Sequence, residues 1–393
     1  MTTPELAEEK KRLLEFWLLC LATFLCFATL SQTALLAVIL KSKGIPLPLT
    51  GIIISSYGIT VILASLFSGK VVNRIGALST LRLGMALLLC AHLSYHFTID
   101  SIPLAIASRL LQGLGFGLFM APAMVYANIR LPKRHLVHLI GILASMIQLP
   151  QSVGPPLGKL YLDHFGSSFF FFVGAAPAVL AVLLTCRMAK EEQSVRANEK
   201  LPLWATGLLP GIRLPLAGIL VTGTLLGMIT SYMAPLLISK SISIALFFTT
   251  FPITAFASRF LLLGKLQHWP RRWMLIFAFA AMASAFLLLT LTRHPAIVVL
   301  LAILFGLGSS MAYPMLNAWI SEQFTPAQQA TPIAIFNAVF NFGLILTPFS
   351  AGYIINLQGY DAMLYLLAGG SLAIMLALLL SRPNQPNSKN RTA

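Results

Sequence analysis

Long apolar stretches separated by short polar breaks run through almost the whole chain. A helix that crosses about 30 Å of hydrocarbon needs about 20 residues, and stretches of that length recur along the sequence. We predict twelve membrane-spanning helices, over Leu14–Leu40, Leu49–Gly69, Ser79–Phe97, Ile102–Ile129, Leu136–Lys159, Ser168–Arg187, Leu214–Ser239, Ile242–Gly264, Trp273–Thr292, Pro295–Ile320, Thr331–Leu357 and Ala362–Ser381.

The widest polar interval between spans divides them six and six. We therefore predict an all-α membrane protein with two six-helix bundles, residues 1–187 and 214–381. Residues 188–213 form a cytoplasmic linker between them, and residues 382–393 form a cytoplasmic tail.

An internal repeat supports two equivalent halves. Gly113-Leu-Gly115 recurs as Gly306-Leu-Gly308, and Pro155 recurs as Pro348, both at an offset of 193 residues; Gly69-Lys70 recurs as Gly264-Lys265 at an offset of 195. Three matches in order at nearly one period indicate duplicated, pseudo-symmetric halves.

Composition agrees with a membrane protein. The mean hydropathy is +0.85 and only 10% of residues are charged, whereas soluble proteins carry about a quarter. Of the 27 Lys and Arg residues, 20 fall on one side of the predicted spans and 5 on the other. Because cationic loops stay cytoplasmic, both termini are predicted to lie inside. No nucleic-acid motif is present, so the positive charge indicates a lipid bilayer as the partner.

The loop after the second span carries a recognisable motif. Gly69, Asn73, Arg74 and Gly76 follow a pattern that closely resembles G-x-x-x-D-R-x-G of the major facilitator superfamily. The resemblance extends to the span count and the two halves, and it implies a loop that docks on the eleventh helix. Asn73 replaces the acid, which forfeits about 0.3–1 kcal/mol at the positive helix end and makes the cytoplasmic gate easier to open. The alternative is a merely positive inner loop.

The fourth span contains Arg109, Gln112 and Gly113 in a pattern that resembles the R-x-x-Q-G-x-G signature of the same superfamily. A lipid-facing arginine about 10 Å below the surface would cost at least about 2.5 kcal/mol. Arg109 is therefore expected to face a wet cavity and bind substrate, or to brace neighbouring helices.

The fifth span resembles the antiporter motif G-x8-G-x3-G-P-x2-G-G, which implies export. Its residues Gly141, Gly154, Pro155 and Gly158 match, whereas Pro150 and Lys159 replace two glycines. Prolines bend a helix and glycines permit close contact. A kinked helix without directional meaning is the alternative.

Polar side chains near the middle of the spans are the candidate substrate contacts. Amide side chains serve equally as interhelical hydrogen-bonding groups, but paired residues four apart share one helix face. The candidates besides Arg109 and Gln112 are Gln148, Tyr313, Asn317, Asn337, Asn341, Gln32, Tyr57 and Tyr232.

Arg259 is a second cation inside a span. Its planar fork suits a carboxylate, so it would receive an anionic group, or it would cap helix ends at the cytoplasmic gate.

A buried acid for proton coupling is not evident. All eleven acidic residues are placed in loops, tails or span ends. His92 and His96 could titrate near neutral pH, although interfacial histidines are more often inert. Uniport, exchange or coupling through the substrate's own charge is expected, with no metal and no cofactor.

Neither a P-loop nor a catalytic constellation is present, so we predict a monomeric secondary transporter of the inner membrane rather than an enzyme or a pump. Two buried cations favour an anionic or neutral small molecule, with export preferred. Uptake of a carboxylate nutrient or siderophore, and flipping of an amphipathic lipid, are the alternatives.

Overall fold

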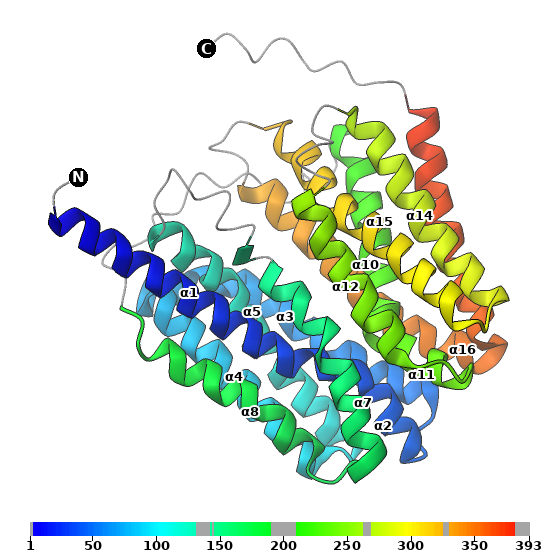
Figure 1. The fold of residues 1–393 in the computed structure, drawn as a ribbon, viewed down its shortest axis with the longest axis horizontal. Coiled ribbons are helices and arrows are strands. Elements are labelled where there is room, and N and C mark those ends of the chain that lie inside the picture. The colour runs from blue at the N-terminus through cyan, green and yellow to red at the C-terminus, as the bar shows by residue number, and fades with distance from the viewer. Residues whose placement is uncertain are drawn as a thin grey trace.

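The computed structural model describes residues 3–130, 142–143, 145–189, 210–261, 269–324 and 330–381, and its regular elements within these ranges are all helical. They are drawn in Figure 1. In chain order they are α1 (Thr3–Ser31), η1 (Gln32–Leu35), α2 (Leu36–Ser42), α3 (Leu47–Ile75), α4 (Ala77–Thr98), α5 (Ile102–Arg130), η3 (Leu149–Ser152), α7 (Gly154–Phe165), α8 (Phe170–Thr185), α10 (Pro210–Ser231), α11 (Met233–Ser239), α12 (Ile244–Leu261), α14 (Arg271–Leu291), α15 (Pro295–Ser321) and α16 (Ala330–Leu380).

Eight helical segments among these residues are long and apolar enough to cross a membrane, and two shorter apolar helices cover Phe170–Thr185 and Ile244–Arg259. They coincide with predicted spans. Two predicted spans fall within α16, which is two helices joined at Gly359 with φ 83°. A residue without a Cβ adopts such an angle without strain. The number of crossings and the side of the termini stay predictions.

The fifth predicted span departs from a simple helix. The chain forms the 3₁₀ turn η3 and then α7, which continues past the predicted end at Lys159 to Phe165. Pro150 lies in η3, and Pro155 lies in the first turn of α7. Because proline has no backbone N–H, these two residues interrupt the hydrogen-bond ladder. Gly141, the first residue of the predicted antiporter motif, lies outside the described ranges.

The repeated glycines perform the same task in both parts of the chain. A Cβ on Gly113 would lie 2.0 Å from the carbonyl oxygen of Tyr57 on α3, and a Cβ on Gly306 would lie 2.7 Å from that of Phe251 on α12. Each glycine therefore lets its helix, α5 or α15, approach a neighbouring backbone closely. The repeat predicted at Gly264 falls outside the described residues.

The helices α1–α8 and α10–α16 form two groups that diverge toward the side where α1 begins (Figure 1). Between the groups, α3 contacts α16, α12 contacts η3 and α7, η1 contacts α10 and α11, and α2 contacts α11. We call the end that carries η1, α2, α7 and α11 the closed end, and the opposite end the open end. One buried apolar cluster spans both groups, whereas a second, around Phe16 and Phe119, stays within the first group.

Candidate functional site

The closed end is sealed by backbone approach between α3 and α16. A Cβ on Gly51 would lie 2.3 Å from the carbonyl oxygen of Pro348, and a Cβ on Gly352 would lie 2.5 Å from that of Leu47. The Tyr232 hydroxyl donates to the same Leu47 carbonyl at 3.1 Å. Tyr232 was expected in the cavity, and the structure places it at this seal.

The motif loop lies at the open end, where the two groups of helices are apart. Gly76 has φ 88° and forms the sharp turn between α3 and α4. Gly69, Asn73 and Arg74 are exposed, and a Cβ on Gly69 would meet nothing within 4 Å. Among the described residues, none therefore packs closely against Gly69 in this arrangement of the halves.

Arg109 is buried on α5, with 6% of its surface exposed. Its Nη1 donates to Oε1 of Gln112 at 2.7 Å, and its Nη2 donates to the carbonyl of Ile54 at 3.0 Å. Its Cζ lies 5.0 Å from the centre of the Tyr57 ring. The remaining donor, Nε, is buried without a hydrogen-bond partner. The cation is thus held by neutral groups while one N–H stays available to an acceptor.

Gln112 extends this network. Its Oε1 also accepts a hydrogen bond from the Tyr95 hydroxyl at 2.9 Å. Its Nε2 is buried and has no partner. Among the described residues no carboxylate forms an ion pair with Arg109. Two unpaired donors and an uncompensated cation therefore meet in the first half of the chain, an arrangement suited to a carboxylate, phosphate or carbonyl group.

The second half holds a smaller polar cluster. The Tyr313 hydroxyl donates to Oδ1 of Asn337 at 2.6 Å, and Nδ2 of Asn341 donates to the Asn337 carbonyl at 2.8 Å. Arg259 is close enough to Tyr313 for electrostatic interaction. Asn317, which lies four residues after Tyr313, accepts a hydrogen bond from Ser321 at 3.3 Å. Hydrogen bonds thus join Tyr313, Asn337 and Asn341 on α15 and α16, and Arg259 of α12 interacts electrostatically with Tyr313.

Gln32 and Gln148 both have a buried, unpaired Oε1. Gln148 lies just before η3. Gln32 opens η1, and its Oε1 would lie 2.0 Å from a Cβ on Gly174 of α8. Its side chain therefore points toward the interior of the first half.

The fifth-helix motif lies where three elements meet. A Cβ on Gly154 would lie 1.8 Å from Oγ of Ser31, and a Cβ on Gly158 would lie 2.8 Å from Leu35. Just before α7, the Ser152 carbonyl accepts a bond from Thr249 of α12 at 3.2 Å. The glycines thus bring α7 against α1 and η1, beside a contact with the second half.

The sequence did not reveal that Glu15 is buried. It lies near the open end of α1 with 4% of its surface exposed, and the Tyr126 hydroxyl donates to its Oε2 at 3.2 Å. Sequence position alone assigned it to a span end. Nothing in the local pattern identifies Tyr126, which is 111 residues away, as its partner.

Two arginines at the open end cap helices in an equivalent way. Arg82 of α4 donates to the carbonyls of Thr185 and Met188, at and just after the end of α8. Arg272 of α14 donates to the carbonyl of Leu378 at 2.8 Å near the end of α16. Cations satisfy the free carbonyls of helix C-termini. The offset of about 190 residues was a signal that could have found this pair.

Lys240 performs a similar task at the closed end. Its Nζ donates to the carbonyls of Leu289 at 2.6 Å and Thr290 at 3.2 Å, near the end of α14. Burial lowers the pKa of Lys240 below its usual value, Asp361 opposes this shift, and Arg293 adds to it. This cation holds the loop after α11 against α14.

Comparison with known proteins identifies the class. The family model of the Major Facilitator Superfamily matches residues 17–240 and 216–393. The staphylopine export protein of Staphylococcus aureus is 23% identical over 372 residues, covering 90% of this chain and 93% of that protein. The methylenomycin A resistance protein of Streptomyces coelicolor is 27% identical over 195 residues, which cover 48% of this chain and 41% of that protein.

Solved transporters share the fold. A point mutant of the nucleoside transporter NupG superposes with a TM-score of 0.80 at 15% identity, covering 93% of this chain and 99% of that one. The human organic anion transporter MFSD10 (TETRAN) gives a TM-score of 0.68 at 16% identity, covering 94% and 99%.

These findings define a multi-pass integral protein of the cell membrane with a transporter fold. The chain belongs to the Major Facilitator Superfamily, which confirms the resemblance carried by its sequence motifs.

Proposed function

We propose that this protein moves a small organic solute, anionic or neutral, across the membrane by alternating access, with export as the preferred direction. In this proposal twelve helices form two bundles, residues 1–187 and 214–381, joined by the linker 188–213. Both termini and the tail 382–393 are cytoplasmic, so the closed end faces outward. The described arrangement is then the inward-open state.

The observation that carries the substrate class is the Arg109 network. Its cation is buried, the partners of the guanidinium are neutral, and Nε of Arg109 and Nε2 of Gln112 lack acceptors. A bound cation would meet an uncompensated positive charge in a medium of low dielectric constant, whereas an anion or a carbonyl would gain hydrogen bonds. Arg259 in the second half adds a further cation and so favours the same substrate class.

Export is supported by the glycine and proline pattern of α7 and by relatives whose names describe export or resistance. Uptake is the second candidate, because a transporter of nucleosides shares the fold at a TM-score of 0.80. Flipping of an amphipathic lipid is a third option, and it requires a lateral opening between the halves.

A flux measurement with purified protein in liposomes tests the proposal. Vesicles preloaded with single compounds, namely benzoate, citrate, uridine or the cation tetraphenylphosphonium, are assayed for counterflow of the same labelled compound. Exchange of a carboxylate or of uridine supports the proposal. Exchange of tetraphenylphosphonium alone would contradict the anionic or neutral class, and lipid scrambling without counterflow would favour flipping.

A further inference from the structure

His92 is a buried histidine that the Arg109 network does not use. It lies on α4 with 1% of its surface exposed, and both ring nitrogens are buried without hydrogen-bond partners. Its ring packs edge-to-face on Tyr95 and Phe171, with centroids 6.2 Å and 5.7 Å away. A histidine in this position is not a satisfied core residue, because an unpaired buried polar group costs free energy.

The unpaired oxygen of Gln32 lies beside it. A single point, the position of a Cβ on Gly174, is 2.0 Å from Gln32 Oε1 and 2.9 Å from His92 Nε2. Gly174 leaves the space in which these two atoms approach each other, although they form no hydrogen bond in this state. Gln32 begins η1, which contacts α10 and α11 of the second half.

The charges around His92 do not favour an imidazolium in this arrangement. Its own helix supplies Tyr95 and His96, and α8 supplies Phe171, which does not titrate. Through Tyr95 and Gln112, the network on α5 leads to the cation of Arg109. A positive charge on His92 would be buried away from water and without a hydrogen bond in this arrangement, which favours the neutral ring.

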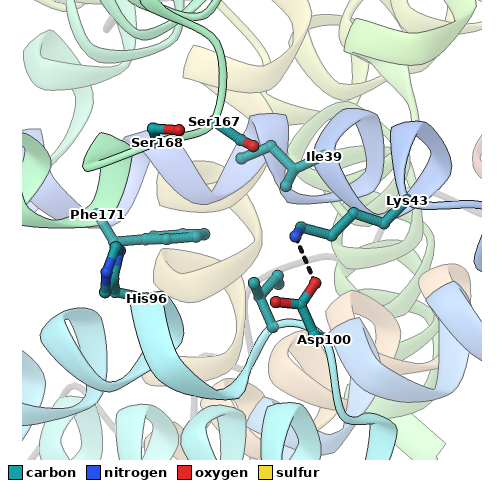
Figure 2. A pocket seen from close by; sticks show the side chains of 8 residues that line it. Ile39, Lys43, His96, Asp100, Ser167, Ser168 and Phe171 are labelled. Carbon is teal, nitrogen blue, oxygen red and sulfur yellow. Dashed lines mark hydrogen bonds and ion pairs between the residues drawn. The ribbon is translucent and has the colours of Figure 1, made fainter.

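A polar pocket lies beside Phe171, which forms part of its lining (Figure 2). At the closed end it is lined by the ion pair of Lys43 with Asp100, by His96, and by Ser167 and Ser168. Phe171 belongs to both places, since it lines the pocket and its ring contacts His92. Phe171 is therefore the side chain through which the pocket and the histidine are in contact.

We propose that His92 is a proton-binding site of the transporter, filled from the outer solution through this pocket when the halves separate at the closed end, and emptied when they meet. The proposal rests on the alternating access proposed above. The sequence indicated no buried acid that could couple transport to protons, and in this proposal His92 supplies the proton-binding group. The step at His92 is the binding and release of one proton at a ring nitrogen, and no other group changes its bonds.

The sign of the linkage follows from the burial. The imidazolium is stabilised only where water reaches the ring, so acid shifts the equilibrium toward the state that is open at the closed end. One linked proton changes the ratio of the two states by up to about tenfold per pH unit. The change is expected to begin as the pH falls through about 6.5, where a hydrated histidine titrates, and to grow at lower pH.

Distance measurements between spin labels on Lys41→Cys and Ser243→Cys test this without any transported substrate. Both residues are exposed at the closed end, one in each half, and the exposed Cys90 and Cys186 are replaced by Ser. In the full-length protein in liposomes, the long-distance fraction should rise as the pH falls. His92→Gln should abolish this rise. His164→Gln, which changes an exposed histidine on α7 outside this pocket, is the control and should keep it.

Phe171→Ala gives a second, independent reading. In this variant water should reach His92 whether the closed end is shut or open, so the proton affinities of His92 in the two states should become similar. The long-distance fraction should then depend less on pH, while the protein stays folded. A pH response that survives in His92→Gln, or one that disappears in Glu15→Gln instead, would overturn the proposal. Absence of any pH response in the parent protein would also overturn it. If the spin-label distances respond to pH as expected but no compound shows counterflow, the result would count against the proposed function and not against the role of His92.

Discussion

The helices α5 and α15 occupy equivalent places in the two halves but carry different interiors. Both helices pack closely on a neighbouring backbone through glycine. A Cβ on Gly115 would lie 2.8 Å from the carbonyl oxygen of Gly84, and a Cβ on Gly308 would lie 2.6 Å from that of Ala278. At the same offset of 193 residues, however, Arg109 corresponds to Ala302.

Gln112 likewise corresponds to Phe305, which is fully buried. The Phe305 ring contacts those of Phe247, Phe251 and Phe286. At these positions α15 thus packs with an aromatic cluster, whereas α5 carries a buried cation and a buried amide. The buried charge is thus confined to α5 in this pair of helices, and the proposed binding role of Arg109 accounts for the difference.

The largest expected effect comes from removing the charge on α5. Arg109→Gln should lower counterflow of an anionic substrate about tenfold or more, because hydrogen bonds to a charged group are worth about 1.5–3 kcal/mol and about 1.4 kcal/mol is tenfold in affinity. The measurement is the initial rate of counterflow in liposomes.

The matched control on α15 is Phe305→Leu, at the position equivalent to Gln112. It should lower thermal stability but leave the counterflow rate close to that of the parent protein. Equal loss of transport in both variants would mean that both positions only support the fold.

A smaller effect is expected from adding a methyl group at the closed end of α3, compared with the same change at its open end. Gly51→Ala introduces a Cβ 2.3 Å from the Pro348 carbonyl oxygen, whereas Gly69→Ala introduces one with no neighbour within 4 Å. Overpacking costs about 1–3 kcal/mol, so Gly51→Ala should favour separation of the halves at the closed end by about fivefold or more. Spin-label distances between positions 41 and 243 report it. An equal shift in Gly69→Ala would refute the assignment of the closed end.

The smallest effect concerns the two capping arginines. Arg82→Met and Arg272→Met remove equivalent bonds to helix-terminal carbonyls, so each should lower the thermal unfolding midpoint by a similar amount, about 2–4 °C per kcal/mol lost. Intrinsic fluorescence of the purified protein during heating measures it. A shift confined to one variant would show that the halves are not equivalent at this position, and the double variant should show additive shifts.

Much of the fold could be predicted from the sequence, for a physical reason. Apolar stretches of about 20 residues leave few alternatives to helices, and the glycine repeat specifies which helices approach closely. The interruption at η3 was less visible. Pro150 and Pro155 signalled a kink, but their pattern does not show how many residues leave the α-helical ladder.

The candidate site could be predicted only in part. Burial of Arg109 followed from the cost of exposing a cation to lipid. Its partners did not follow, because a helix that is apolar on every side carries no moment that defines its rotation. The bond from Tyr313 to Asn337 and the position of Tyr232 at the seal depend on that rotation. Burial of Glu15 depends on Tyr126, which is remote in the sequence.

The central claim is that the two halves expose one site to one side of the membrane at a time. Spin labels at positions 41 and 243 report the closed end, and labels on Asn73→Cys and Gln323→Cys, both exposed near the open end, report the other. On addition of a transported compound, the account predicts that one distance lengthens while the other shortens in the same molecules. Distances that change together, or a closed end that never opens while counterflow proceeds, would contradict it.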